Sequence, residues 1–109
     1  MRITDLPFGI TNWAEVPGEK HLGTVGIAAW RTRQFKPVRI RMVEYSRGYL
    51  ADNWCQKGYF LLVIAGELGT ELADGRKFTL EPGMSYQVAD GAEARRSHTA
   101  TGATLFIID

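Results

Sequence analysis

The sequence predicts an all-β protein, folded as a sandwich or a barrel. Turn signals recur about every ten residues from Gly48 onward, a spacing typical of such folds. No segment carries a convincing helical period of apolar residues. The apolar run from Tyr59 to Ala65, bounded by Gly58 and Gly66, indicates one buried strand near the centre of the chain.

The chain is expected to form one domain, because 109 residues leave no room for a second. Hydrophobic residues make up 45% of it and charged residues 23%, as in ordinary globular proteins, and the formal net charge is +1. This charge gives no reason to expect nucleic acid or a membrane surface as a partner. A single cysteine, no signal peptide and no apolar run near about 20 residues predict a cytoplasmic protein.

Residues 1–23 are predicted to be an arm packed on the barrel, and residues 24–109 the barrel itself. Prolines and glycines interrupt every candidate helix in the arm. An arm needs apolar contacts to offset the entropy that is lost when it becomes ordered. Its expected anchors are Phe8, Ile10, Trp13 and Val16.

Two strands are expected to follow the arm. The segment from Val25 to Trp30 is apolar on both faces, which favours a strand buried beneath the arm. The segment from Val38 to Tyr45 alternates, with Arg39 and Arg41 on one face and the apolar residues around them on the core face. Glu44 follows the alternation of the core face, so it would lie either at an exposed strand end or in a polar pocket.

Shorter strands complete the predicted fold. The segment from Glu67 to Leu80 predicts a hairpin, whose Asp74-Gly75 pair is typical of a type I′ turn. Three more strands, separated by glycine-containing turns, are predicted at residues 84–89, 94–99 and 104–108.

The polar residues around the central apolar run have a distinctive spacing. Asn53, Cys55 and Tyr59 stand two and four residues apart, and Gly66 follows seven residues after Tyr59. This spacing resembles the first motif of the cupins, small β-barrels in which two His and a Glu bind a metal and a glycine closes the hairpin. The spacing of the second cupin motif is matched downstream at Gly83, Ala89, Gly91, Ala94 and His98.

From Arg41 to Asp109 the chain resembles a group of small bacterial single-domain cupins labelled for an Asp-His-Cys-Trp signature. The similar segments are Tyr-Leu-Ala-Asp at 49–52, Trp-Cys at 54–55 and Leu-x-Pro-Gly-Met-Ser-Tyr-Gln-Val-Ala-Asp at 80–90. The resemblance implies a cupin-type double-stranded β-helix, or jelly-roll barrel. Cupins also commonly pair, and a homodimer is expected here through the sparsely charged segment Val25 to Trp30 as an edge strand.

The resemblance implies a divalent metal, either Zn, Ni or Fe, but most of the expected ligands are replaced. Asn53 and Tyr59 stand where the group has histidines, and the histidine of the second motif is missing near Ala94 and Arg95. No strongly bound metal is therefore predicted. The remaining metal-ligand candidates are Cys55, His98 and Glu44.

The same stretch predicts a ligand-binding pocket inside the barrel. Because residues two apart on a strand share a face, Asn53 and Cys55 are expected inside, with the intervening Trp54 pointing away. An inward Arg95 would suit a small anionic ligand, because a guanidinium clamps carboxylates and phosphates. The predicted ligand-binding set is Asn53, Cys55, Tyr59, Gln87, Arg95 and His98.

These observations favour a small cytoplasmic cupin-fold protein whose barrel pocket is small-molecule-binding or vestigial. A metal-dependent cupin enzyme, of the oxygenase or isomerase type, is an alternative that rests on the resemblance. A dimeric module that senses oxidants through Cys55 is another. No catalytic residue is predicted, and the expected partners are a second copy of the chain and a small anionic or polar ligand.

Overall fold

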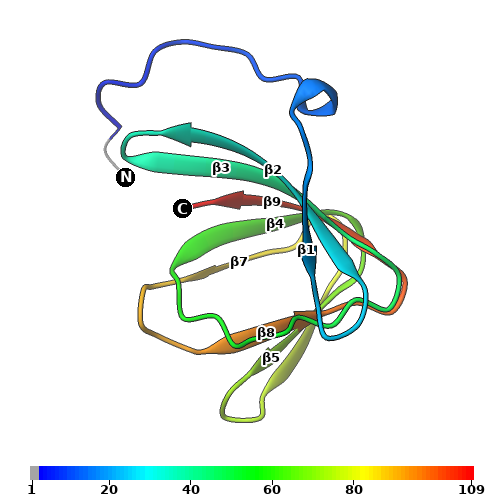
Figure 1. Cartoon of the computed structure of the whole chain (residues 1–109). Coiled ribbons are helices and arrows are strands. Elements are labelled where there is room, and N and C mark those ends of the chain that lie inside the picture. The colour runs from blue at the N-terminus through cyan, green and yellow to red at the C-terminus, as the bar shows by residue number, and fades with distance from the viewer. Residues whose placement is uncertain (1–2) are drawn as a thin grey trace.

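The computed structural model describes residues 3–109 and confirms the predicted all-β class (Figure 1). Within these residues, nine strands follow a single 3-10 turn, η1 (Trp13–Glu15). The strands are β1 (Glu19–Leu22), β2 (Ile27–Phe35), β3 (Val38–Tyr45), β4 (Tyr59–Gly66), β5 (Leu68–Leu72), β6 (Lys77–Leu80), β7 (Ser85–Val88), β8 (Arg95–His98) and β9 (Ala103–Ile108). None of the described residues belongs to a helix that is long and apolar enough to cross a membrane.

The strands form two antiparallel sheets that face one another. One sheet has six strands in the order β1-β2-β3-β9-β4-β7, and the other has three in the order β6-β5-β8. Figure 1 shows β3, β9 and β4 on one side of the barrel and β5 and β8 on the other. The buried apolar core lies between the two sheets: Val43, Leu61, Val63, Leu68, Leu80, Ala103, Leu105 and Ile107.

Strand β4 is buried on one face only, which corrects the expectation of a fully buried strand. Leu61 and Val63 are 2% and 1% exposed, and they pair across the sheet with Ile107 and Leu105. The alternate residues of β4, described below, remain exposed on the outer face of the sheet. The antiparallel six-stranded sheet therefore has one face packed on the core and one face turned outward.

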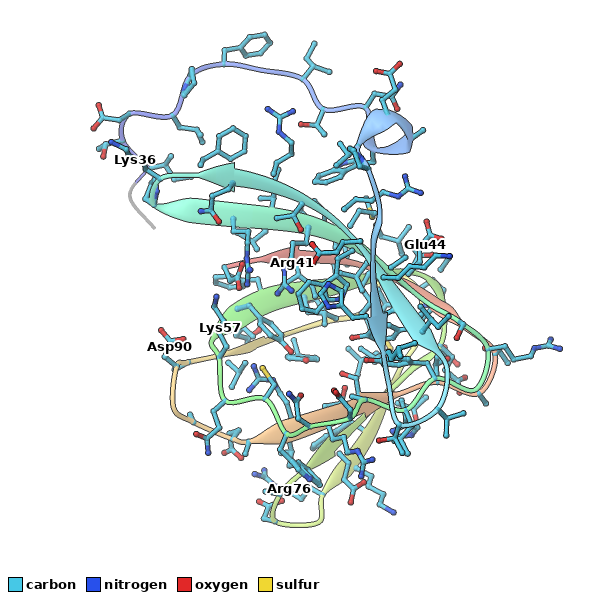
Figure 2. All side chains as sticks on the ribbon, in the orientation of Figure 1. Lys36, Arg41, Glu44, Lys57, Arg76 and Asp90 are labelled. Atoms are coloured by element: carbon cyan, nitrogen blue, oxygen red, sulfur yellow. The ribbon has the colours of Figure 1, made fainter. Side chains whose placement is uncertain are left out.

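Strand β3 faces the opposite way from the prediction. Val43 and Arg41 are 1% and 5% exposed and point into the barrel, whereas Glu44 points away from it (Figure 2). Register explains the difference, since Val43 pairs with Leu105, whose side chain is fully buried. Arg41 follows Val43 into the interior because residues two apart on a strand share a face. The prediction of Arg41 as a solvent-facing residue was wrong.

The predicted arm is anchored by fewer residues than expected. Trp13 packs edge-on against Phe106, with ring centroids 6.1 Å apart, and Arg31 donates hydrogen bonds to the Trp13 and Val16 carbonyls. Phe8 and Ile10, in contrast, are 92% and 85% exposed. The last residues assigned to the arm form β1, which pairs with β2, and Met1 and Arg2 lie outside the described residues.

Strand β2 is not an edge strand along the segment predicted to be one. Ile27 to Trp30 pairs with β1 on one side, and Ala28 to Phe35 pairs with β3 on the other. The hairpin between β5 and β6 occurs where predicted, but its turn is not type I′. Gly75 has a positive φ of 98°, and Asp74 is not among the described residues with positive φ, although type I′ requires both.

Candidate functional site

The barrel interior holds a cavity of about 670 Å³. Its walls come from β1, β2, β3, β4, β8 and β9 and from the irregular connection that precedes β4. Figure 2 shows Arg41 pointing into the space between the sheets and Lys57 on the connection beside it. Cationic side chains outnumber acidic ones around the cavity, and the charged lining residues are Lys20, Arg39, Arg41, Lys57, Arg95 and Asp52.

Three of these cations converge on the Asp109 carboxylate, whose side chain is only 1% exposed. Arg39 holds it with two hydrogen bonds, Nε to Oδ1 at 3.0 Å and Nη2 to Oδ2 at 2.7 Å. Arg41 Nη2 and Lys57 Nζ lie 3.4 and 3.2 Å from Oδ2. Burial alone would raise the pKa of Asp109, but the Arg39 hydrogen bonds and the neighbouring positive charges lower it below its usual value. One carboxylate thus faces three cations, which leaves this end of the cavity positive.

Arg41 has a donor that the protein does not use. The residue is 5% exposed, and its Nε–H has no hydrogen-bond partner among residues 3–109. Its guanidinium lies 4.8 Å from the centre of the Trp30 ring, a cation–π contact that supports the charge in the interior. Burial, followed by the nearby Arg39 charge, lowers the pKa of Arg41 from its ordinary value. An unmade hydrogen bond at a buried donor costs about 1–3 kcal/mol, so a ligand oxygen placed there would be favoured.

A second polar atom beside Trp30 also lacks a partner. The His21 ring stacks on Trp30 at 3.9 Å, and its buried Nε2 makes no hydrogen bond within the part of the chain that the structure describes. The nearest carboxylate oxygen, from Glu19, is 3.6 Å away, too far for a good hydrogen bond. His21 and Arg41 both contact Trp30, so this indole is flanked by two polar groups that a bound molecule could satisfy.

Arg95 positions the connection that carries the predicted site. It is 2% exposed and donates to the backbone carbonyls of Cys55 at 3.3 Å and Glu93 at 3.2 Å, and also to that of Lys57. Its guanidinium also lies 4.5 Å from the centre of the Tyr59 ring. Because most of its donors are engaged by main chain, Arg95 acts chiefly as a positioning residue, although it does face inward as an anion-binding arginine would.

Four tyrosines supply neutral polar groups to the barrel interior. The Tyr59 and Tyr86 hydroxyls are 3.0 Å apart, and Tyr45 stacks on Tyr49 with centroids 4.2 Å apart. Burial is the main cause that raises the pKa of both Tyr45 and Tyr86 well above the ordinary value. Tyr45 and Tyr86 therefore stay protonated near neutral pH, and their hydroxyls can serve as hydrogen-bond donors or acceptors.

The structure brings four of the six predicted site residues to this cavity. Asn53, Cys55, Tyr59 and Arg95 line it. The connection containing Asn53 and Cys55 is not a regular strand, and Cys55 makes only an isolated bridge with Arg95. Strict alternation does not apply there, and Trp54, although 43% exposed, borders the cavity as well.

Gln87 and His98 do not line the cavity. Gln87 pairs with Phe60 across the β4–β7 ladder, and it shares the outer face with that exposed side chain. In β8, Arg95 and Ser97 face inward, so the alternate position of His98 faces outward, where its ring lies over Gly69 of β5. A side chain at Gly69 would collide with this imidazole.

The residues present do not fit the divalent metal that the cupin resemblance implies. Glu44 and His98 lie outside the cavity, so they do not converge with Cys55. No group of three His, Cys, Asp or Glu residues within 3–109 is arranged to hold a metal ion. The buried Arg41 and Arg95 guanidiniums would also repel a cation from the interior.

Sequence reasoning missed the residues that make the cavity positive. Arg39 and Arg41 were assigned to the solvent face, and Asp109 and Trp30 were not singled out. One signal was present in the sequence, because Val43 and Tyr45 continue the alternation of the two arginines and mark their face as the inner one. The Asp109 partnership spans 68 residues of sequence from Arg41, and no local pattern encodes it.

Comparisons with known proteins define the fold. No family model matches the sequence, and none of the curated proteins matches it. Among solved structures, the polyketide cyclase RemF from Streptomyces resistomycificus is similar, with 16% identity, 94% of this chain and 78% of that chain covered, and a TM-score of 0.79.

Two further solved structures are similar to this chain in fold. A predicted oxalate decarboxylase from Thermotoga maritima is 13% identical, covers 92% of this chain and 97% of its own, and has a TM-score of 0.76. A sugar phosphate isomerase from Silicibacter pomeroyi, described as from a cupin superfamily, is 14% identical and has a TM-score of 0.72. The match covers 92% of this chain and 74% of that chain. At such identities these likenesses show the fold alone, and that fold is the cupin-type double-stranded β-helix barrel.

Proposed function

We propose that this protein binds a small anionic molecule, a carboxylate or phosphate, in the barrel cavity and needs no strongly bound metal to do so. The observation that carries the proposal is Arg41, a buried arginine with an unused Nε–H, set beside Arg39 and Lys57 on the cavity wall. Buried charges in proteins are normally fully paired, and a guanidinium is suited to oxyanions.

The ligand would have two kinds of contact. Its oxyanion would accept a hydrogen bond from Arg41 Nε and share Arg39 and Lys57 with Asp109. An apolar or planar part would lie against Trp30 and the tyrosines, which offer broad faces with polar edges. Asn53 and the Cys55 thiol would border the ligand from the connection before β4. A cavity with a few polar groups on an otherwise aromatic and aliphatic wall is typical of small-molecule sites.

We also propose that the chain is a member of the Asp-His-Cys-Trp group of single-domain cupins that has exchanged metal binding for anion binding. The replaced motif positions Asn53 and Tyr59 support this, because both now line the positive cavity. We propose that the protein is cytoplasmic, because a single cysteine suits a reducing compartment.

A direct titration tests the proposed function. Trp30 and Trp54 line the cavity, so their fluorescence should report binding there. Inorganic phosphate, oxalate and benzoate are expected to give saturable changes, whereas the neutral analogues oxamide and benzamide are expected to give weak ones. Equal responses to the anions and to the neutral analogues would contradict the proposal.

We further propose a homodimer formed through the outer face of β4. Phe60, Leu62 and Ile64 are 54%, 40% and 45% exposed on this face, and Phe8 and Ile10 of the arm are almost free of contacts within their own chain. A second copy would supply a partner for both features in a two-fold interface in which the arm of each chain lies on the β4 face of the other.

Sedimentation velocity is expected to show a dimer at tens of micromolar, and Leu62→Lys should dissociate it, because an ammonium would be buried at the centre of an apolar interface. Val25→Lys is the matched control: Val25 is 54% exposed and lies in the segment that the sequence analysis favoured for the interface. A monomeric wild-type protein, or dissociation by Val25→Lys alone, would contradict this assignment.

A further inference from the structure

A second cavity, of about 400 Å³, opens where the two sheets are not joined. Strands β6 and β7 are the edge strands of their sheets, and the cavity lies between the β5–β6 pair and β7. Its wall is predominantly apolar, and its main side chains are Leu72, Phe78, Leu80, Met84, Tyr86 and Val88.

A polar wall divides this cavity from the positive one. The Tyr59 and Tyr86 hydroxyls meet at 3.0 Å, and Arg95 Nε donates to the Tyr59 hydroxyl at 3.3 Å. Tyr59 lines the positive cavity and Tyr86 the apolar one, while Arg95 borders both. The three side chains hold one another in place, so the apolar cavity is a separate compartment.

The floor of the apolar cavity carries one unused polar group. Thr70 on β5 is 3% exposed, and its Oγ1 has no hydrogen-bond partner among the described residues. A buried hydroxyl without a partner costs free energy, and the cross-strand partner of Thr70 is the apolar Phe78, which also lines the cavity. A bound molecule with one donor or acceptor at this position would remove that cost.

The charged groups at the rim do not call for an ionic ligand. Arg76 lies at the tip of the β5–β6 hairpin (Figure 2), and it pairs with Glu93 at 2.9 Å and with Asp74 at 2.8 Å. These side chains are about half exposed, and the one cation among them, Arg76, is already paired with two carboxylates. Phe78 and Met84, 48% and 47% exposed, give the opening an apolar lip.

We propose that this cavity binds a small neutral ring molecule that carries one hydrogen-bonding group, of the chemical class of phenol. The ring would contact Leu72, Leu80 and Phe78, and its polar group would exchange a hydrogen bond with Thr70 Oγ1. The volume admits a substituted single ring, and aromatic and thioether side chains favour flat partners. This site is independent of the anion site on the other side of the tyrosine wall.

Methyl-resolved NMR titration with phenol and toluene tests the proposal. Phenol is expected to shift the methyl signals of Leu72, Leu80 and Met84 saturably, and to leave those of Val43 and Ile107 in the positive cavity unchanged. Thr70→Val keeps the shape and removes the hydroxyl, so phenol affinity should fall about 3- to 10-fold, while toluene affinity should not fall. Thr104→Val, on the outer face of β9, is the matched control and should change neither affinity.

Two further measurements keep the test decisive. If Thr70→Val fails to fold, Leu72→Trp, at a half-buried position, should fill the cavity and abolish binding of both probes. Saturating phosphate should not displace phenol, so failure of this proposal can be distinguished from failure of the proposed anion site. Phenol shifts confined to Val43 and Ile107, no saturable shift, or unchanged phenol affinity in Thr70→Val would overturn the proposal.

Discussion

Replacement of Arg41 by methionine is expected to lower the affinity of the barrel cavity for phosphate or oxalate by about 10- to 100-fold. A hydrogen bond to a charged group contributes about 1.5–3 kcal/mol, and each 1.4 kcal/mol is a factor of ten in affinity. Arg41 supplies the buried, unused Nε–H, so no other described arginine can replace this contact. Methionine has a similar length and is apolar, so it can fill the space beside Trp30.

The matched control is Arg47→Met, which removes the same charge from an exposed position outside the cavity. It should leave the dissociation constant nearly unchanged, because an exposed charge is screened by solvent and salt. Isothermal titration calorimetry at fixed ionic strength provides the measurement. Anion binding by Arg41→Met at wild-type affinity would show that the ligand site lies elsewhere.

The strands are encoded locally, which is why the sequence predicts them well. The turns at Asp74-Gly75, Pro82-Gly83 and Asp90-Gly91 occur where expected, and the structure places strands between them. Gly83 and Gly91 have φ values of 89° and 75°, a region that favours glycine, so these residues mark chain reversals. Such signals depend on a few adjacent residues, and a single sequence contains them.

The inner face of β3 depends on partners that are distant in sequence. Apolar alternation favoured Met42 as a core residue, but Met42 pairs with Phe106 on the outer face, where Trp13 of the arm packs on Phe106. Arg41 can occupy the interior because Asp109 and Trp30 compensate its charge. An arginine that is paired only after folding looks the same in the sequence as a solvated one.

The candidate site was predicted only in part, for a related reason. The motif spacing located Asn53, Cys55 and Tyr59, because these positions precede or begin β4 and face the barrel. His98 was included because it is one of only two histidines, but the register of β8 with β5 turns it outward. A one-residue difference in register exchanges the two faces of a strand, so Arg95 faces the cavity and Arg96 does not.

Replacement of Asp109 by asparagine is expected to lower the free energy of unfolding by about 2–4 kcal/mol at pH 7. Removal of one partner from a buried ion pair typically costs about 3–5 kcal/mol. A smaller loss is expected here, because Arg39 and Lys57 are 26% and 53% exposed and keep part of their hydration. Urea unfolding should report the loss as a lower midpoint. Asp74→Asn, which breaks an exposed pair with Arg76, should change the midpoint little.

The stabilisation that the Asp109 carboxylate contributes should decrease as the solution becomes acidic. The pKa of Asp109 in the folded protein lies below its ordinary value, because the Arg39 hydrogen bonds and neighbouring cations outweigh the effect of burial. Its stabilisation is therefore fully present above a pH of about 4, the pKa of an unfolded aspartate, and is lost as the pH falls through the lower folded value. The difference in stability between wild type and Asp109→Asn should shrink over that acidic range.

Added anion should then distinguish a merely structural carboxylate from one that occupies part of an anion site. In Asp109→Asn the donors of Arg39, Arg41 and Lys57 no longer face a protein carboxylate, so phosphate should bind more tightly than in wild type. A ligand that binds only the folded state stabilises it by RT ln(1 + [L]/Kd). Phosphate should therefore raise the urea midpoint of the variant by more than it raises that of the wild type. Sulfate at equal ionic strength should act similarly, while chloride should not. Equal stabilisation of the two proteins by phosphate would show that these three cations serve Asp109 alone.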